Sequence, residues 1–214
     1  MSIRPIKRVV QSQPTLEGAG VKLRRAFGFG NTGDFDPFLL LDDFRNEHPQ
    51  DAQAFASEAT KDPAVLAARF KAALEQLKRD PHVDTTRIAA IGYCFGGAVV
   101  LGMARAGADL AAVVTFHGAL ATTSPAQPGK VKARMLVLAG GADPFVPPEQ
   151  VEAFKREMQT AGARFEVITY PGAKHGFTNP DAAKYGMSQL AYDAVADRES
   201  WAAMLKLFKE MWPG

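Results

Sequence analysis

The feature that most constrains this chain is a glycine-rich turn between two apolar segments, in the stretch RIAAIGYCFGGAVVLGMA at residues 87–104. The turn holds Cys94, the one cysteine among 214 residues. A nucleophile at a sharp strand-to-helix turn has a strained backbone, and its neighbours two residues away crowd each other unless they are small. Gly92 and Gly96 meet that demand, and Gly97 lets the helix lie close to the strand. The pattern predicts a nucleophile elbow with Cys94 at its tip.

The predicted turn also defines the surroundings of the thiol. It lifts the sulfur of Cys94 above a sheet and places it at a helix N-terminus, where the helix dipole favours the thiolate. The backbone N–H of Phe95 would then face a developing oxyanion. The alternative is a cysteine buried for packing in a glycine-rich loop, and residues elsewhere in the chain must decide between the two.

From residue 62 onward, helix-like and strand-like segments alternate. Asp62 can cap a helix that Pro63 opens. Four apolar residues then follow at helical spacing: Leu66, Phe70, Leu74 and Leu77. Strand-like runs rich in Val, Ile, Leu and Phe lie at 87–93, 110–118, 133–143 and 164–177, and further helices are predicted at about 96–106, 147–162 and 197–212. Strands buried on both faces and separated by helices predict an α/β fold with a mostly parallel sheet.

Two residues could act with the thiol. Asp143 follows the strand-like run RMLVLAGGA, and His175 follows FEVITYPGAK. Asp143 alone would more often begin a turn, and His175 alone would more often be a surface loop residue. With Cys94, however, they lie at the carboxyl ends of consecutive parallel strands, where such sheets place their chemistry. The order nucleophile, acid, base is also that of the α/β-hydrolases, so the sequence favours a Cys94–Asp143–His175 triad.

Residues from about 55 to 214 resemble the C-terminal part of the dienelactone hydrolase family, α/β-hydrolases that use cysteine where their relatives use serine. The matching motifs are GYCFGG, GADPFVP and HGFTNP, and they agree in sequence, order and spacing. The resemblance implies an α/β-hydrolase domain at 62–214 with Cys94, Asp143 and His175 as catalytic residues. It implies hydrolysis of a small ester or lactone through a thioester, with no cofactor and no metal.

The first 51 residues have a different pattern. RVVQSQP and VKLRRAFGF flank TLEGAG, which predicts an antiparallel hairpin. RRAFG and DFDPFLLLDDFRNEHPQD resemble the opening of pirin, an iron-binding bicupin. The resemblance stops before the histidine-rich metal motif of that family, and His48 alone cannot supply a metal site. We therefore expect a pirin-like segment at 1–51, a junction at 52–61, and no bound metal.

The hydrolase resemblance is also partial. An α/β-hydrolase places about four strands before its nucleophile strand, whereas only a helix precedes 87–93 here. The other strands would carry a second oxyanion donor and the charged residues that bind a carboxylate, and no position in 1–61 matches them. We therefore expect a fusion of two family fragments with reduced activity. We also expect an exposed sheet edge at 87–93 that drives homo-oligomerisation.

Composition excludes several classes of protein. A formal net charge of +2 argues against a nucleic-acid or acidic-membrane binder, and 47% hydrophobic residues suffice for a core. One cysteine cannot form an internal disulfide, which suits a reducing compartment. The N-terminus lacks the apolar stretch of a signal peptide, and no window approaches the roughly 18 apolar residues of a membrane span. We expect a soluble, cytoplasmic protein.

The sequence leaves three functions open. The first is a cysteine-dependent ester or lactone hydrolase; the second is a non-catalytic interaction protein, a remnant hydrolase sheet with a pirin-like arm. A cupin-type metal protein is the least supported. Four further residues are not expected to act in catalysis. We expect His117 to pack or hydrogen-bond at the cleft and His82 to face solvent. Trp201 and Trp212 are expected in the core.

Overall fold

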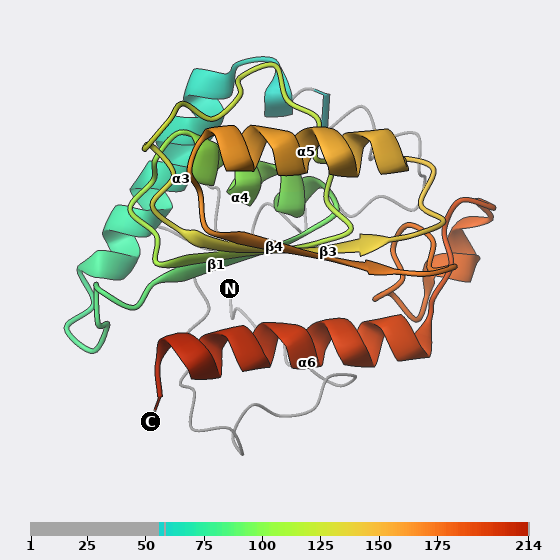
Figure 1. The fold of residues 1–214 in the computed structure, drawn as a ribbon. Coiled ribbons are helices and arrows are strands. Elements are labelled where there is room, and N and C mark those ends of the chain that lie inside the picture. Colours follow the sequence, from blue (N-terminus) through green and yellow to red (C-terminus); the bar gives the residue numbers. More distant parts are fainter. Residues whose placement is uncertain (1–55, 58, 214) are drawn as a thin grey trace, which may run out of the picture.

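The structure, a computed structural model, describes residues 56–57 and 59–213. Its helices and strands mostly alternate along the chain (Figure 1). In chain order they are α3 (Pro63–Lys78), β1 (Ala89–Tyr93), α4 (Phe95–Arg105), β2 (Ala112–Phe116), β3 (Arg134–Gly140), α5 (Pro148–Thr160), β4 (Phe165–Tyr170), the 3₁₀ helix η2 (Ala182–Tyr185) and α6 (Ala194–Met211). The predicted hairpin, the pirin-like segment, His48 and half of the junction lie outside the described residues.

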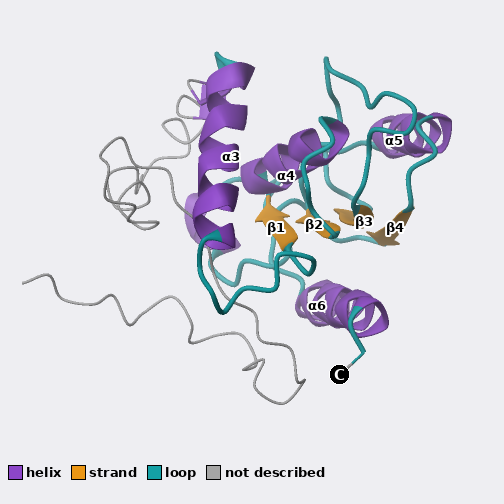
Figure 2. Ribbon diagram, turned by 90° about the vertical axis from the view of Figure 1, so that its left-hand side faces the viewer, coloured by secondary structure: helices purple, strands orange, loops and turns teal. Residues whose placement is uncertain are grey.

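The four strands form one parallel sheet in the order β1-β2-β3-β4. Helices cover both faces: α3, α4 and α5 lie on one side and α6 on the other (Figures 1 and 2). Parallel strands joined by helical crossovers need cover on both faces, and all five residues of β2 are buried. The α/β fold with a parallel sheet predicted from the sequence is confirmed.

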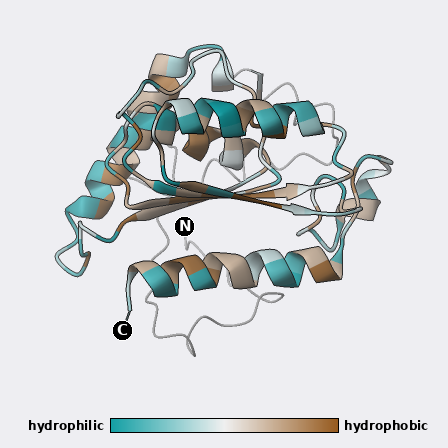
Figure 3. Ribbon diagram, in the orientation of Figure 1, coloured by the Kyte–Doolittle hydropathy of each residue, from teal (hydrophilic) through white to brown (hydrophobic). Residues whose placement is uncertain are grey.

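The sheet separates two hydrophobic clusters. Val113 of β2 packs with α4 and α5 in one cluster, and the next residue, Val114, packs with α6 in the other. This division follows from the alternation of side chains along a strand. In Figure 3 the strands are largely apolar, whereas the outer surface of α5 is hydrophilic. The sheet is therefore the common wall of both cores.

Capping residues define where the helices begin. Asp62 Oδ1 accepts hydrogen bonds from the N–H groups of Ala64 (2.9 Å) and Val65 (3.2 Å), as the sequence predicted. The C-terminal helix begins at Ala194 rather than at 197, because Asp193 caps it in the same way. This second cap was missed, since the predicted start relied on the apolar pattern further along.

The strand before His175 is shorter than predicted. The run 164–177 was expected to be extended throughout, but β4 ends at Tyr170 and the chain turns at Pro171 and Gly172. Gly172 has a φ of 78°, which favours glycine. His175 therefore lies on a loop beyond the strand rather than at its tip.

Strand β1 lies at one side of the sheet. Within the residues that the structure describes, β1 pairs with β2 alone. This agrees with the expected edge at 87–93, although any strand from residues 1–55 lies outside the described part. The predicted oligomer through this edge remains a prediction.

A buried ion pair joins α4 to α5. The Arg105 guanidinium donates to both Glu157 carboxylate oxygens, each at 2.9 Å, and to the Leu120 carbonyl at 2.7 Å. Glu157 also accepts a hydrogen bond from the Ala126 N–H at 2.8 Å. The side chains of Arg105 and Glu157 are only 4% and 15% exposed. Together they fix the segment that follows β2 against the two helices.

Removing one member of this pair should destabilise the fold. Glu157→Ala leaves a buried guanidinium without its countercharge, which typically costs about 3–5 kcal/mol. We expect a correspondingly lower free energy of unfolding in urea, followed by circular dichroism. Glu152→Ala is the matched control on the same helix, because its partner Lys155 and Glu152 itself are exposed, and such pairs contribute little. Equal losses in the two variants would contradict the role given to Arg105.

Candidate active site

The backbone of Cys94 links a strand to a helix. Its N–H donates to the Phe116 carbonyl at 3.0 Å and so continues the pairing of β1 with β2. Its carbonyl accepts from the Ala98 N–H at 3.2 Å and so begins α4. To serve both elements Cys94 has φ 48° and ψ −118°, a conformation that L-residues rarely adopt. The strained turn predicted from the sequence is present.

The three glycines of this turn are not equivalent. A Cβ on Gly92 would overlap the carbonyl group of Gly96, and a Cβ on Gly97 would overlap Thr115 Oγ1. A Cβ on Gly96, by contrast, would meet no heavy atom within 4 Å. The sequence argument expected Gly92 and Gly96 to crowd each other unless both are small; the crowding is present at Gly92 and absent at Gly96. Gly97 thus lacks room for a side chain beside Thr115, and Gly92 lacks it because the backbone of Gly96 fills that space.

Alanine at Gly92 and alanine at Gly96 should therefore have opposite effects. Gly92→Ala forces the turn apart, and overpacking of this kind costs about 1–3 kcal/mol. Gly96→Ala lies in the first turn of α4, where alanine is favoured over glycine by roughly 0.5–1 kcal/mol. Thermal unfolding should show a lower midpoint for Gly92→Ala and an equal or higher one for Gly96→Ala. A comparable loss at both positions would refute the steric difference.

Three side chains form a hydrogen-bonded chain at this turn. His175 Nε2 lies 3.1 Å from Cys94 Sγ, and His175 Nδ1 lies 2.8 Å from Asp143 Oδ2. The other carboxylate oxygen of Asp143 accepts from the Phe145 N–H at 2.8 Å. Asp143 is 3% exposed, whereas Cys94 is exposed. The carboxylate is thus sealed inside, and the sulfur faces solvent.

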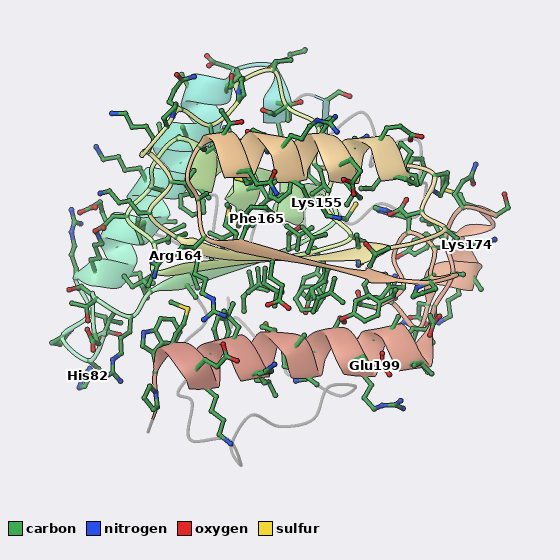
Figure 4. All side chains as sticks on the ribbon, in the orientation of Figure 1. His82, Lys155, Arg164, Phe165, Lys174 and Glu199 are labelled. Atoms are coloured by element: carbon green, nitrogen blue, oxygen red, sulfur yellow. The ribbon has the colours of Figure 1, made fainter. Side chains whose placement is uncertain are left out.

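These residues gather at one end of the sheet. In Figure 4, Arg164 lies before β4 at one end and Lys174, the neighbour of His175, lies at the other. Cys94 follows β1 directly, and Asp143 comes three residues after β3 ends at Gly140. The structure therefore brings the three predicted residues together at the carboxyl end of the sheet.

The electrostatics of the chain favour a charged pair. Partial desolvation raises the pKa of the Cys94 thiol, but the hydrogen bond and charge of His175, with the Phe95 N–H, outweigh it and lower the pKa. Burial lowers the pKa of His175, yet the hydrogen bonds to Asp143 and Cys94 raise it to about 9. The site therefore shifts the equilibrium toward a thiolate beside an imidazolium, a form in which sulfur is nucleophilic.

The backbone N–H of Phe95 lies beside the reactive atom. Its interaction with the Cys94 sulfur helps to lower the pKa of the thiol. An N–H on this side of the nucleophile is suited to hold an oxyanion that forms on a carbonyl attacked by sulfur. Its backbone position follows from Phe95 being the first residue of α4.

The structure also shows neighbours that the sequence did not identify. The ring of Phe145 lies 5.1 Å from that of His175 at a steep angle, and Thr178 Oγ1 lies 2.9 Å from His117 Nε2. His117 is 5% exposed and packs against His175. Its place after a strand was a signal for this, whereas nothing in the sequence singled out Thr178. His82 is exposed as expected and lies away from the site in Figure 4.

The described residues offer neither a metal-binding cluster nor a membrane-spanning helix. Within residues 56–57 and 59–213, no cluster of three or more His, Cys, Asp or Glu side chains is arranged to hold a metal ion. Over the same residues, no helix combines the length and apolar character that crossing a membrane requires. Trp201 and Trp212, expected in the core, are partly buried against the cluster under α6.

The thiol should titrate below an ordinary cysteine. The midpoint of iodoacetamide alkylation with pH should lie below the roughly 8.5 of a free cysteine. His175→Ala removes the hydrogen bond and charge that lower the pKa, so its midpoint should rise. His82→Ala, an exposed histidine outside the chain of three, should leave it unchanged. A common midpoint near 8.5 in the native protein and His175→Ala would mean that Cys94 is an ordinary thiol.

A parallel sheet with a strained turn after one strand, and with an acid and a histidine beyond the ends of two later strands, is typical of an α/β-hydrolase. The family model of the "Dienelactone hydrolase family" matches residues 35–212. The chain therefore belongs to the dienelactone hydrolase family, a class of ester and lactone hydrolases. The match begins inside the segment for which the sequence predicted pirin-like structure.

The chain is also similar to individual proteins. The uncharacterized protein K02A2.1 of Caenorhabditis elegans is 37% identical over 147 residues, which are 68% of this chain and 93% of that protein. A "Putative carboxymethylenebutenolidase" of Escherichia coli (strain K12) is 33% identical over 135 residues, 59% of this chain and 47% of that protein. The chain thus spans about half the length of this second relative.

Solved structures show the same fold. A dienelactone hydrolase-like promiscuous phosphotriesterase, P91 from metagenomic libraries, is 37% identical with a TM-score of 0.70. The similarity covers 76% of this chain and 68% of that one. The α/β-hydrolase fold is therefore confirmed.

A separate similarity concerns a short segment. A pirin-like protein of Caulobacter vibrioides (strain ATCC 19089 / CIP 103742 / CB 15) is 47% identical over 51 residues, 24% of this chain and 18% of that protein. The expected pirin-like segment has this support in sequence, and its structure lies outside the described residues.

Proposed function

We propose that this chain hydrolyses carboxylic esters or lactones through Cys94 as a covalent nucleophile, without a cofactor. The observation that carries the proposal is the chain of contacts from Cys94 Sγ through His175 to Asp143 at a strained turn. Nucleophile, base and orienting acid within hydrogen-bond reach are the requirements of acyl transfer.

The first half of the reaction makes a thioester. The Cys94 thiolate attacks the carbonyl carbon of the substrate, and the carbonyl electrons move onto oxygen, toward the Phe95 N–H. When this oxyanion collapses, the bond to the alcohol oxygen breaks, and His175 Nε2 gives its proton to the leaving alkoxide. In a lactone, the alcohol stays attached to the acyl group.

The second half returns the free enzyme. His175, now neutral, takes a proton from a water molecule, whose oxygen attacks the thioester carbonyl. Collapse breaks the carbon–sulfur bond and releases a carboxylic acid and the Cys94 thiolate. Asp143 holds His175 in the tautomer that turns Nε2 toward sulfur throughout, and its burial keeps that orientation fixed.

The names of the relatives support a small-molecule substrate. The family is named for dienelactone hydrolysis, and the Escherichia coli relative bears the name of a butenolide-opening enzyme. An aromatic surface flanks the sulfur: Phe95 is 36% exposed and Phe145 is 45% exposed. A small ester or lactone with an apolar acyl part suits this rim.

Three further features complete the proposal. A thiol nucleophile must stay reduced, so we place the protein in a reducing compartment such as the cytoplasm. The pirin-like segment is proposed to be a fusion partner of the hydrolase domain. The edge of β1 is proposed to pair with a second copy of the chain.

The alternative of a non-catalytic interaction protein is less well supported, since a remnant sheet needs no Cys94–His175–Asp143 chain.

The proposal predicts a covalent intermediate on Cys94. The protein should hydrolyse p-nitrophenyl acetate, and Cys94→Ala should reduce kcat/KM by at least about 1,000-fold, since removing a triad nucleophile costs that much or more. Mass spectrometry of the quenched native reaction should find one added acetyl group on the peptide that contains Cys94, removable with hydroxylamine.

Controls separate this from incidental ester cleavage. His175→Ala should lose activity nearly as fully as Cys94→Ala, because the two act as a unit. His82→Ala removes an exposed histidine that has no contact with the site, and it should keep full activity. Equal activity in native protein and Cys94→Ala would disprove the proposed nucleophile.

A further inference from the structure

His117 has an unusual backbone beside the site. Among the described residues, only Cys94 (φ 48°) and His117 (φ 41°) have a positive φ without being glycine. Each directly follows a strand, and the two strands are neighbours, with Tyr93 of β1 opposite Phe116 of β2. A side chain in this region is strained by about 1 kcal/mol or more. His117 is only 5% exposed, so its surroundings hold it there.

The ring of His117 contacts the segment that carries His175. Its Nε2 lies 2.9 Å from Thr178 Oγ1. Its ring centroid lies 5.1 Å from that of His175 and 5.2 Å from that of Phe177, both at steep angles. The His117 side chain, at the end of β2, thus contacts three residues of the short segment 175–178.

His117 does this without adding charge. Burial and the nearby charge of His175 lower its pKa to about 3, with Asp143 acting weakly in the opposite direction. The ionisable groups whose charges act on His175 are Asp143 and Cys94. A second imidazolium here would oppose the charge on His175, whereas a neutral ring leaves the Cys94–His175 pair intact.

The other contacts of this loop tie it elsewhere. The His175 carbonyl accepts from the Ala191 N–H, and the Phe177 carbonyl accepts from the Asp193 N–H. Both bonds run to the segment before α6, and the Ala173 carbonyl accepts from Ala142 beyond β3. The bond between His117 and Thr178 is a side-chain hydrogen bond that joins this loop to the end of β2, the neighbour of the strand that ends at Cys94.

We propose that the His117–Thr178 hydrogen bond positions His175 against Cys94, which makes His117 and Thr178 positioning residues of the site. The inference rests on the proposed pairing of Cys94 with His175, but not on ester turnover. When the bond is lost, the loop can move His175 Nε2 away from the sulfur. The hydrogen bond and charge that lower the pKa of the thiol then weaken while the fold persists.

The pH profile of Cys94 alkylation tests this directly. Thr178→Val removes the hydroxyl at nearly constant volume, and we expect its alkylation midpoint to rise toward that of His175→Ala. At a pH below both midpoints, each unit of rise lowers the thiolate fraction, and so the alkylation rate, about tenfold. Thr178→Ser keeps a hydroxyl and should retain most of the native profile.

A matched control and a second variant sharpen the result. Thr160→Val makes the same substitution in α5, where the hydroxyl bonds to the Arg156 carbonyl of its own helix, and it should leave the midpoint unchanged. His117→Asn tolerates the left-handed backbone but lacks the ring, and it should raise the midpoint as Thr178→Val does. The double variant should shift no further than His117→Asn alone, since both single variants remove the same hydrogen bond.

Each outcome decides the matter. A thermal midpoint that falls in Thr178→Val while its alkylation midpoint stays native would show a merely structural bond and overturn the inference. If His175→Ala shifts the alkylation midpoint and both Thr178→Val and His117→Asn leave it native, the inference fails and the proposed function stands. If His175→Ala itself causes no shift, no pairing exists to be positioned, and both proposals fail.

Discussion

The site depends on one backbone constraint: Cys94 must end a strand and begin a helix at the same residue. Its N–H completes the pairing with Phe116 and its carbonyl starts the helical bonds at Ala98. These two demands are compatible only if α4 returns close to β1, which requires Gly92 to have no side chain. The exposed sulfur and the Phe95 N–H beside it are direct results of that geometry.

The rest of the site follows from parallel strands. Because β1, β2 and β3 run in one direction, their carboxyl ends meet at one edge, and residues far apart in sequence become neighbours. Asp143 is buried beneath this edge, and its charge is matched by His175. The raised pKa of His175 and the lowered pKa of Cys94 are two effects of the same short contact.

Sequence reasoning succeeded where the signal is local. The cap at Asp62, the four strands and the turn at Cys94 each depend on residues within a few positions of one another. Asp143 and His175 could be predicted because strand order converts sequence position into place in the sheet. The Arg105–Glu157 ion pair and the His117–Thr178 bond span 52 and 61 positions. No periodicity predicts such pairs, and the HGFTNP motif contains Thr178 without identifying its partner, since only the packed fold brings the two residues together.

Strand β2 helps to hold Cys94 and His117 in their strained backbone conformations. A residue held outside the usual backbone regions costs about 1–3 kcal/mol, and the two strained residues flank the end of β2. Phe116, the last residue of that strand, is 1% exposed and stacks on Tyr93 at 4.5 Å. Neither turn can relax without disturbing this buried contact. The sheet therefore fixes Cys94 and His117, and His175, carried on a loop, is the member of the site whose position depends on the side chains around it.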